Sequence, residues 1–320
     1  MTTTGRYDKC LSSEISDESE ASRANSRIAD ELQRQQRQIL VNGRKVNYVD
    51  VGTGGPPILL LHGIGASHRI WQATIPSIAR MRRVVAIDLP GFGTSDSLPR
   101  LFGAVEAADH IGRVCDALDL VQVDLVGHSM GGMLAMQLVS SDPARVRRLA
   151  LISASLTSIM KFYHHPVAGF IMQPRVCSRF IGQMLVASMP IPRILIEVSI
   201  STPQLRRFVC RDILAVPEAV DEQLLLDVLM SSGGGRTLSA ALMGFQFDFI
   251  RAASAVSERR LDTLVVAGAK DRFTVPADIS AFAQLIGEHE LVVVPDVGHW
   301  PMVERPRIVN CVLKEWLEIG

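Results

Sequence analysis

Several features are missing from this sequence of 320 residues, and each absence excludes a class of function. Neither sign of charge is in excess, because 33 basic residues balance 33 acidic ones, so no nucleic-acid partner is expected. No G-x-G-x-x-G motif, P-loop or Cys/His cluster with metal-ligand spacing occurs, and we expect neither a cofactor nor a metal. The apolar stretch at 180–192 is too short to span a bilayer and contains two prolines, so no integral membrane segment is expected.

Cysteine is also scarce and unpaired in pattern. The five cysteines are odd in number and widely scattered, at Cys10, Cys115, Cys177, Cys210 and Cys311. The N-terminus has no apolar core of the kind that a secretory signal needs. These two observations predict reduced thiols that serve mainly in packing, in a cytoplasmic protein.

What is present centres on one five-residue motif, G-x-S-x-G, at Gly127-His128-Ser129-Met130-Gly131. An apolar, β-branched run at 121–126 precedes the motif and predicts a buried strand, and the sequence at 132–139 predicts a helix. A serine on a sharp strand-to-helix turn exposes its hydroxyl at the carboxyl edge of a sheet. The motif in this context predicts a nucleophilic serine.

A nucleophilic serine needs a base and a group that orients the base. Asp271 follows a short apolar strand at 264–268, and His299 lies in the loop that leaves a strand at 291–294. Taken singly, such an aspartate is often a helix cap and such a histidine is often structural. The order Ser129, Asp271, His299 along the chain favours a Ser-Asp-His triad.

Acyl transfer also needs donors for the oxyanion. The elbow supplies the backbone N–H of Met130, and the N–H of Ile64 is predicted as the second donor. Ile64 follows a strand at 58–61 and lies between Gly63 and Gly65, which free the backbone. We expect the neighbouring residues His62, His128 and Trp300 to shape the site, with His62 bracing its loop rather than acting as the base.

Five segments resemble the α/β-hydrolase superfamily, in particular its lidded esterases and C–C bond hydrolases. They are His62–Gly65, Asp88–Gly93, Gly127–Gly132, Gly268–Asp271 and Gly298–Pro301. The resemblance implies a mostly parallel, doubly wound α/β sheet with an N-terminal hairpin and an inserted helical lid. It also implies that the loop after Asp88 is ordered by that carboxylate. Epoxide hydrolases and haloalkane dehalogenases of this superfamily carry an aspartate at the position of Ser129, which disfavours their chemistry.

The chain divides into four parts on this interpretation: a polar leader at 1–37, core halves at 38–154 and 257–320, and a lid at 155–256 between them. The first half of the leader is expected to be disordered, and a sparse apolar stripe predicts a helix in the second half. Asn42-Gly43 predicts a type I′ hairpin. The lid is expected to contain helical stretches at Phe162–Phe180, Ile181–Ile196, Gln204–Leu214, Asp221–Met230 and Thr237–Ala253. Prolines are expected to break this region, at Pro166, Pro174, Pro190, Pro192, Pro203 and Pro217.

The lid holds six of the 12 methionines, which suit adaptable apolar surfaces. The leading hypothesis is therefore a serine hydrolase that cleaves a carboxylic ester of a hydrophobic or amphipathic small molecule. A C–C bond hydrolase, or a lyase, cyclase or acyltransferase with the same triad, remains an alternative. So does a ligand-binding receptor without turnover. Whether the protein forms a homodimer is open.

Overall fold

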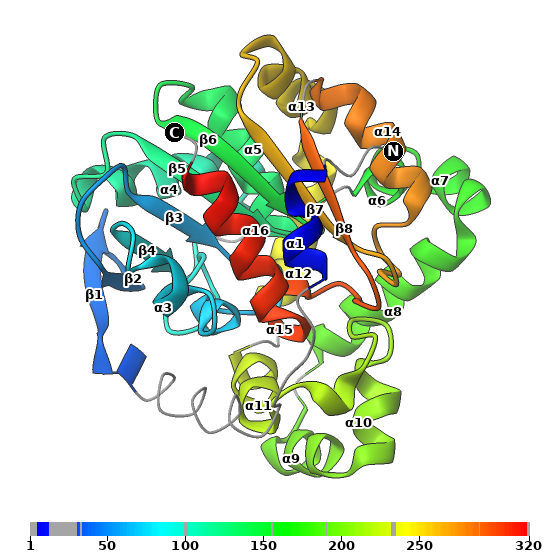
Figure 1. Ribbon diagram of the computed structural model, residues 1–320. Helices are drawn as coiled ribbons and strands as arrows, with labels where there is room; N and C mark the ends of the chain where they lie inside the picture. The colour runs from blue at the N-terminus through cyan, green and yellow to red at the C-terminus, as the bar shows by residue number, and fades with distance from the viewer. Residues whose placement is uncertain are drawn as a thin grey trace.

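The computed structural model describes residues 5–12, 31–32, 34–98, 102–154, 156–189, 191–231, 235–287 and 289–318. An eight-stranded sheet lies at its centre, with the order β1-β2-β4-β3-β5-β6-β7-β8 (Figure 1). The first two pairings are antiparallel and all the others are parallel, as the predicted fold requires. The strands are β1 (Gln36–Val41), β2 (Arg44–Val51), β3 (Ile58–Leu61), β4 (Val84–Ile87), β5 (Val123–His128), β6 (Val146–Ile152), β7 (Thr263–Gly268) and β8 (Glu290–Val294).

The predicted hairpin is confirmed. Asn42 and Gly43 both have positive φ, at 51° and 71°, and they join β1 to β2. A type I′ turn needs that conformation at both central residues. The hairpin strand β1 begins at Gln36, so the end of the predicted leader helix is strand instead.

Helices cover both faces of the sheet because side chains alternate along each strand. Leu59 and Leu61 of β3 belong to a core shared with α4, α5, α13 and α14, whereas Ile58 and Leu60 belong to a core shared with α3 and α16. Figure 1 shows α16 running across this second face of the sheet. The covering helices are α3 (Ile75–Ile78), α4 (Ala104–Ala117), α5 (Met130–Ser141), α13 (Phe249–Glu258), α14 (Pro276–Ile286), α15 (Pro301–Glu304) and α16 (Pro306–Glu318), with a 3-10 turn η2 (His68–Trp71).

Between β6 and α13 the chain forms a helical insertion without strands in its described residues. The predicted helical stretch Phe162–Phe180 belongs to three helices, and the breaks predicted at Pro166 and Pro174 are confirmed because each proline begins a new helix. The predicted Ile181–Ile196 helix is likewise split, and α13, which was assigned to the lid, packs on α5 and α14 of the core. The insertion contains α6 (Thr157–His164), α7 (Pro166–Met172), α8 (Pro174–Ser188), α9 (Arg193–Ser201), α10 (Pro203–Cys210), η3 (Pro217–Ala219), α11 (Glu222–Ser231), α12 (Gly235–Leu242) and η4 (Met243–Gln246).

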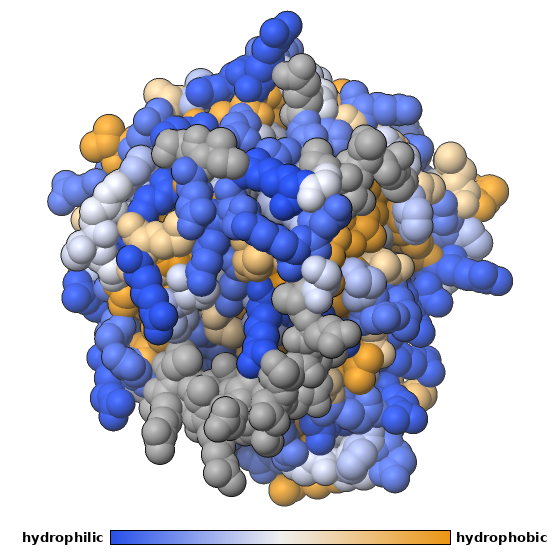
Figure 2. All heavy atoms as spheres, in the orientation of Figure 1, coloured by the Kyte–Doolittle hydropathy of each residue, from blue (hydrophilic) through white to orange (hydrophobic). Residues whose placement is uncertain are grey.

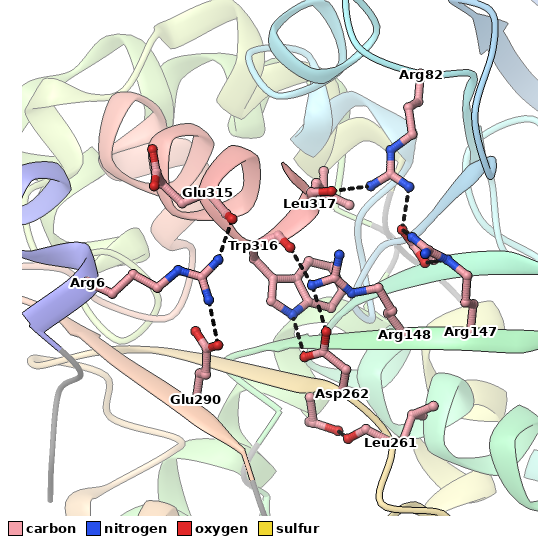
Figure 3. Close-up of polar contacts among 12 residues, drawn as sticks. Arg6, Arg82, Arg147, Arg148, Leu261, Asp262, Glu290, Glu315, Trp316 and Leu317 are labelled. Carbon is pink, nitrogen blue, oxygen red and sulfur yellow. Dashed lines mark hydrogen bonds and ion pairs between the residues drawn. The ribbon is translucent and has the colours of Figure 1, made fainter. Parts of the chain in front are cut away.

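The expectation that the first half of the leader is disordered is wrong for residues 5–12. This segment forms η1 (Gly5–Tyr7) and α1 (Asp8–Leu11) and lies against α16. Tyr7 is fully buried, and its hydroxyl donates to Glu290. Arg6 pairs with Glu290 at 2.7 Å and donates to the Glu315 carbonyl (Figure 3). No apolar periodicity marks this docking, because it comes from single side chains, the aromatic Tyr7 and the basic Arg6. Residues 1–4 and 13–30, which hold the rest of the predicted disorder and much of the predicted leader helix, lie outside the described residues.

The prediction that all cysteines are reduced is also wrong. Cys10 of α1 and Cys311 of α16 form a disulfide across 301 positions of sequence, whereas Cys115, Cys177 and Cys210 are free and buried. Sequence spacing did not reveal the pair, because folding alone brings the two ends of the chain together. Disulfides persist in oxidising compartments, so the cysteine pattern no longer supports a cytoplasmic location. Within the described part of the chain, no helix is long and apolar enough to cross a membrane.

Candidate active site

The turn between β5 and α5 carries Ser129. Its backbone is in an unusual conformation, with φ 51° and ψ −117°, and its N–H donates to the Ile152 carbonyl at 2.9 Å. A positive φ costs free energy in a non-glycine residue, and such strain is typical of functional sites. The adjacent strand β6 therefore holds the serine in a turn that aims its side chain away from the core.

Three predicted residues are brought together here from distant parts of the chain. The His299 Nε2 atom lies 3.0 Å from Ser129 Oγ, and His299 Nδ1 lies 2.8 Å from Asp271 Oδ2. All three residues are buried, with 7% of Ser129 and 7% of His299 exposed. With Nδ1–H donating to Asp271, the Nε2 lone pair faces the serine hydroxyl, which is the tautomer that a general base needs.

Asp271 is held as a carboxylate by its surroundings. Its Oδ1 atom accepts from the N–H groups of Phe273 at 2.8 Å and Thr274 at 3.1 Å, and the Thr274 hydroxyl donates to Oδ2. Burial opposes ionisation, but His299 and these donors outweigh it and keep the pKa of Asp271 below its usual value. A carboxylate with fixed orientation can hold the imidazole of His299 in place.

The loop of His299 is tied to the helical insertion. The His299 N–H donates to the Ile213 carbonyl at 2.7 Å, and the His299 carbonyl accepts from His128 Nε2 at 2.9 Å. Burial lowers the pKa of His128 to about 3, so this side chain is neutral and serves as a fixed donor. Segments from the sheet edge and from the insertion therefore position the base together.

Glu304 has a positioning role that the sequence interpretation did not assign. Its Oε1 accepts from the Gly298 N–H at 2.9 Å, and its Oε2 accepts from the Ala215 N–H at 2.7 Å. The carboxylate thus joins the histidine loop to the insertion segment at 213–216. A signal was present, because Glu304 lies three residues after the segment Gly298–Pro301 that resembles the superfamily, but Ala215 lies far away in sequence.

The loop after β3 borders the serine. Ile64 and Gly65 line the same cavity as Ser129 and Met130. The N–H of Met130, as the first residue of α5, has no acceptor within the helix. His62 accepts from the Leu89 N–H at 2.9 Å and donates to the Gly63 carbonyl at 2.7 Å, and burial lowers its pKa to about 4. His62 therefore links the loops after β3 and β4.

Asp88, after β4, orders its own surroundings. Its Oδ1 atom accepts from the N–H and the Nδ1 of His68, and its Oδ2 atom accepts from Asn47 and Thr94. Burial opposes its ionisation, yet the contacts with His68 lower its pKa to about 2. These hydrogen bonds order the loops around Asp88 and do not orient His299.

A cavity of about 480 Å³ lies above Ser129, between the sheet edge and the insertion. Its lining is apolar and rich in methionine, with Met130, Met133, Met160, Met184 and Met189. Trp300 lines it beside His299, and Gln183 and Ser199 are among its few polar residues. No lysine, arginine, aspartate or glutamate is among the described residues of the lining. The cavity suits an uncharged, largely apolar molecule.

Comparisons with known proteins agree with the fold. Residues 56–170, which include β3, β5 and the serine turn, match a family model described as alpha/beta hydrolase fold. The chain has the α/β-hydrolase fold. A meta-cleavage product hydrolase from Pseudomonas fluorescens IP01 (22% identity, TM-score 0.65, 88% of this chain and 97% of that one) shares the fold. So does a thermophilic esterase from Thermogutta terrifontis (24% identity, TM-score 0.64, 89% of this chain and 98% of that one).

Among sequence relatives, this chain is 39% identical over 122 residues to a 2-hydroxy-6-oxo-2,4-heptadienoate hydrolase of Pseudomonas putida. That match covers 37% of this chain and 44% of the relative. A second match is to the dihydrolipoyllysine-residue acetyltransferase component of an acetoin cleaving system of Pseudomonas putida. This chain is 29% identical to it over 279 residues, which cover 84% of this chain and 66% of the relative. The matches therefore span less than two thirds of these relatives.

Proposed function

We propose that this α/β-hydrolase is a serine esterase that cleaves an uncharged, hydrophobic or amphipathic carboxylic ester. The observation that carries the proposal is the Ser129–His299–Asp271 chain of hydrogen bonds at the base of an apolar cavity. A hydroxyl within hydrogen-bond reach of a base, whose other nitrogen is fixed by a carboxylate, is the arrangement that acyl transfer requires.

In the proposed reaction, Ser129 Oγ attacks the ester carbonyl while His299 takes the hydroxyl proton. The backbone N–H groups of Ile64 and Met130 stabilise the oxyanion. Collapse of the tetrahedral intermediate releases the alcohol, which receives its proton from His299. Water, deprotonated by the same histidine, then attacks the acyl-enzyme; the acid leaves and Ser129 regains its proton. Asp271 stabilises the imidazolium that forms in each half-reaction.

The helical insertion acts as a lid in this proposal. Side chains of α6, α8 and α9 line the cavity together with residues of the sheet edge. An apolar enclosure of this size excludes water and binds an acyl chain through surface burial rather than through charge.

A C–C bond hydrolase is the second candidate, favoured by the sequence relative that acts on a heptadienoate. Such a substrate carries a carboxylate, and a buried carboxylate needs a cationic or hydrogen-bonding partner. No cationic residue occurs among the described residues of the cavity lining. This difference favours an uncharged ester.

Labelling with a fluorophosphonate, read by intact mass, tests the nucleophile. The wild-type protein should gain one adduct, and Ser129→Ala and His299→Ala should gain none, because one lacks the nucleophile and the other its base. Ser199→Ala is the matched control, since Ser199 also lines the cavity but lies outside the triad, and it should be labelled like the wild type.

A substrate panel tests the chemistry. p-Nitrophenyl esters with neutral acyl chains should be cleaved with kcat/KM at least about tenfold above that for an ester of equal length with a terminal carboxylate, because the described lining of the cavity offers that charge no cationic partner. Faster turnover of a chromogenic dienoate than of every neutral ester would replace the ester assignment by C–C cleavage. An unlabelled wild type would indicate a receptor or a non-hydrolytic reaction.

A further inference from the structure

Large apolar side chains are exposed mainly on the helical insertion. Among the described residues, they cluster on α7–α10, and in Figure 2 hydrophobic atoms lie at the lower and right edges of the molecule, where Figure 1 places these helices. The densest set occupies the end of α8 and the start of α9. This α8–α9 corner consists of Leu185, Val186, Met189, Ile191, Ile194 and Leu195, which are between 38% and 63% exposed.

Charge is nearly absent from this corner. Between 180 and 196 the sequence has a single charged residue, Arg193. A surface helix of a globular protein normally turns its aliphatic side chains toward the core. On α8 and α9, several of these side chains are exposed instead. An exposed apolar patch of this kind marks an interaction surface.

The corner is continuous with the candidate active site. Val186, Met189 and Ile191 are exposed and also line the cavity that contains Ser129. An apolar path therefore runs from the outer surface of the insertion to the nucleophile. An occupant of the corner would have direct access to that cavity.

The arginines near the α8–α9 corner indicate which kind of molecule would bind there. The segment 166–211 contains six arginines and one acidic residue, Glu197, in a chain whose total charge is zero. The Arg193 and Arg207 side chains are 77% and 74% exposed. Five of the six arginines form ion pairs: Arg193 with Glu197, Arg206 and Arg207 with Glu222 and Glu218, and Arg179 and Arg211 with Asp212. Each guanidinium has five N–H donors, so the exposed Arg193 and Arg207 can still donate to a phosphate.

A second copy of the chain fits this surface poorly. A twofold interface would bring the arginines of both copies into one contact area, and an excess of like charge there opposes association. A lipid surface complements both features at once, because acyl chains accept the aliphatic corner and lipid phosphates accept arginines at its rim.

We propose that the α8–α9 corner inserts into the surface of an anionic phospholipid bilayer, with arginines of α8–α10 contacting the headgroups. The cavity then opens toward the membrane, so an amphiphilic molecule can enter it without crossing water. Membrane binding does not depend on catalysis, and it is measured on Ser129→Ala as well as on the wild type.

Vesicle co-sedimentation of the full chain tests the proposal. The substitutions Leu185→Ser, Ile194→Ser and Leu195→Ser change exposed corner residues that do not line the cavity. The triple variant should bind phosphatidylcholine/phosphatidylglycerol vesicles at least about tenfold more weakly than the wild type, since each buried methylene contributes to partitioning. Val121→Ser is the control, because Val121 is 81% exposed but precedes β5, at the other end of the strand from Ser129.

A second measurement does not depend on removing apolar side chains from the α8–α9 corner. The native tryptophans Trp71, Trp300 and Trp316 are buried, so Ile194→Trp adds an exposed reporter whose emission should shift to the blue on anionic vesicles. Equal binding by the triple variant and the wild type, or no blue shift, overturns the proposal. Binding only to pure phosphatidylcholine overturns the arginine contacts, and a wild-type dimer that the triple variant cannot form assigns the corner to self-association.

Discussion

At the scale of single residues, the serine turn depends on the absence of a side chain at Gly131. A Cβ atom on Gly131 would lie 2.4 Å from the Leu61 carbonyl oxygen and 2.5 Å from that of His62. These are backbone atoms of β3 and the residue that follows it, and they cannot move without shifting the loop of Ile64. The close approach of α5 to β3 therefore sets the distance between Ser129 and Ile64, one of the two predicted oxyanion donors.

Replacing Gly131 by alanine should thus disturb both stability and catalysis. We expect a loss of roughly 1–3 kcal/mol in the free energy of unfolding, as for other overpacked sites, and slower fluorophosphonate labelling of Ser129. Gly182→Ala is the matched control, because among the described residues nothing beyond the adjoining residues and backbone of its own helix lies within 4 Å of its added Cβ, and alanine favours the α8 helix. Urea unfolding of both variants tests this, and equal stability of the two would contradict it.

At the scale of elements, the junction of α6 and α14 contains a buried acid. Asp278 of α14 is 3% exposed, and its Oδ1 accepts from the Ser158 N–H at 2.9 Å and from the Ser158 hydroxyl at 2.5 Å. Its Oδ2 is buried without a hydrogen-bond partner among the described residues. Burial therefore raises the pKa of Asp278 to about 6 despite the Ser158 donors.

This junction should lose stability as the pH rises. Between the usual value of 3.8 and about 6, the folded protein binds more protons at Asp278 than the unfolded chain, so the free energy of unfolding falls with increasing pH. The loss amounts to at most about 3 kcal/mol. Asp278→Asn resembles the protonated acid, cannot titrate and should remove this component of the pH dependence.

Urea unfolding across that pH window measures the effect. Asp109→Asn serves as the control, because it removes an exposed carboxylate of α4 and should retain the wild-type slope. The assignment to Asp278 fails if the asparagine variant keeps the wild-type slope. The consequence extends to the insertion, since α6 begins it and carries cavity residues Ile159 and Met160.

At the scale of the whole molecule, the two ends of the chain are joined on one face of the sheet. The Cys10–Cys311 disulfide, together with the contacts of Arg6 and Tyr7, holds α1 against α16. Helix α16 is in turn fixed to the sheet by Arg148, whose guanidinium lies over the Trp316 ring and pairs with Asp262 at 2.7 Å (Figure 3).

Reduction of this disulfide should lower the free energy of unfolding by about 2–4 kcal/mol, because the bond restricts a very long loop in the unfolded chain. Urea unfolding with and without reductant measures the change. A Cys10→Ser/Cys311→Ser double variant is the control, since its unfolding should not respond to reductant. Thiol titration of the denatured, unreduced wild type should find the three free cysteines; five would contradict the disulfide.

The sequence determined the local chemistry of this protein. The strands, the serine turn, the Asn42-Gly43 hairpin and the order of Ser129, Asp271 and His299 follow from short-range patterns, because apolar periodicity and turn residues act over a few positions. Proline positions likewise mark the starts of insertion helices, and the breaks predicted at Pro166, Pro174 and Pro203 coincide with the first residues of α7, α8 and α10.

Only the tertiary structure decided what distant segments do to each other. Four contacts join residues more than 80 positions apart. They are the disulfide, the hydrogen bond from Tyr7 to Glu290, the one from Ala215 to Glu304 and the one from Ser158 to Asp278. No pattern in a single sequence encodes such distances, because they arise when the sheet closes and its two faces are covered. The outward orientation of the α8–α9 corner belongs here too, since exposure depends on which helices pack beside it.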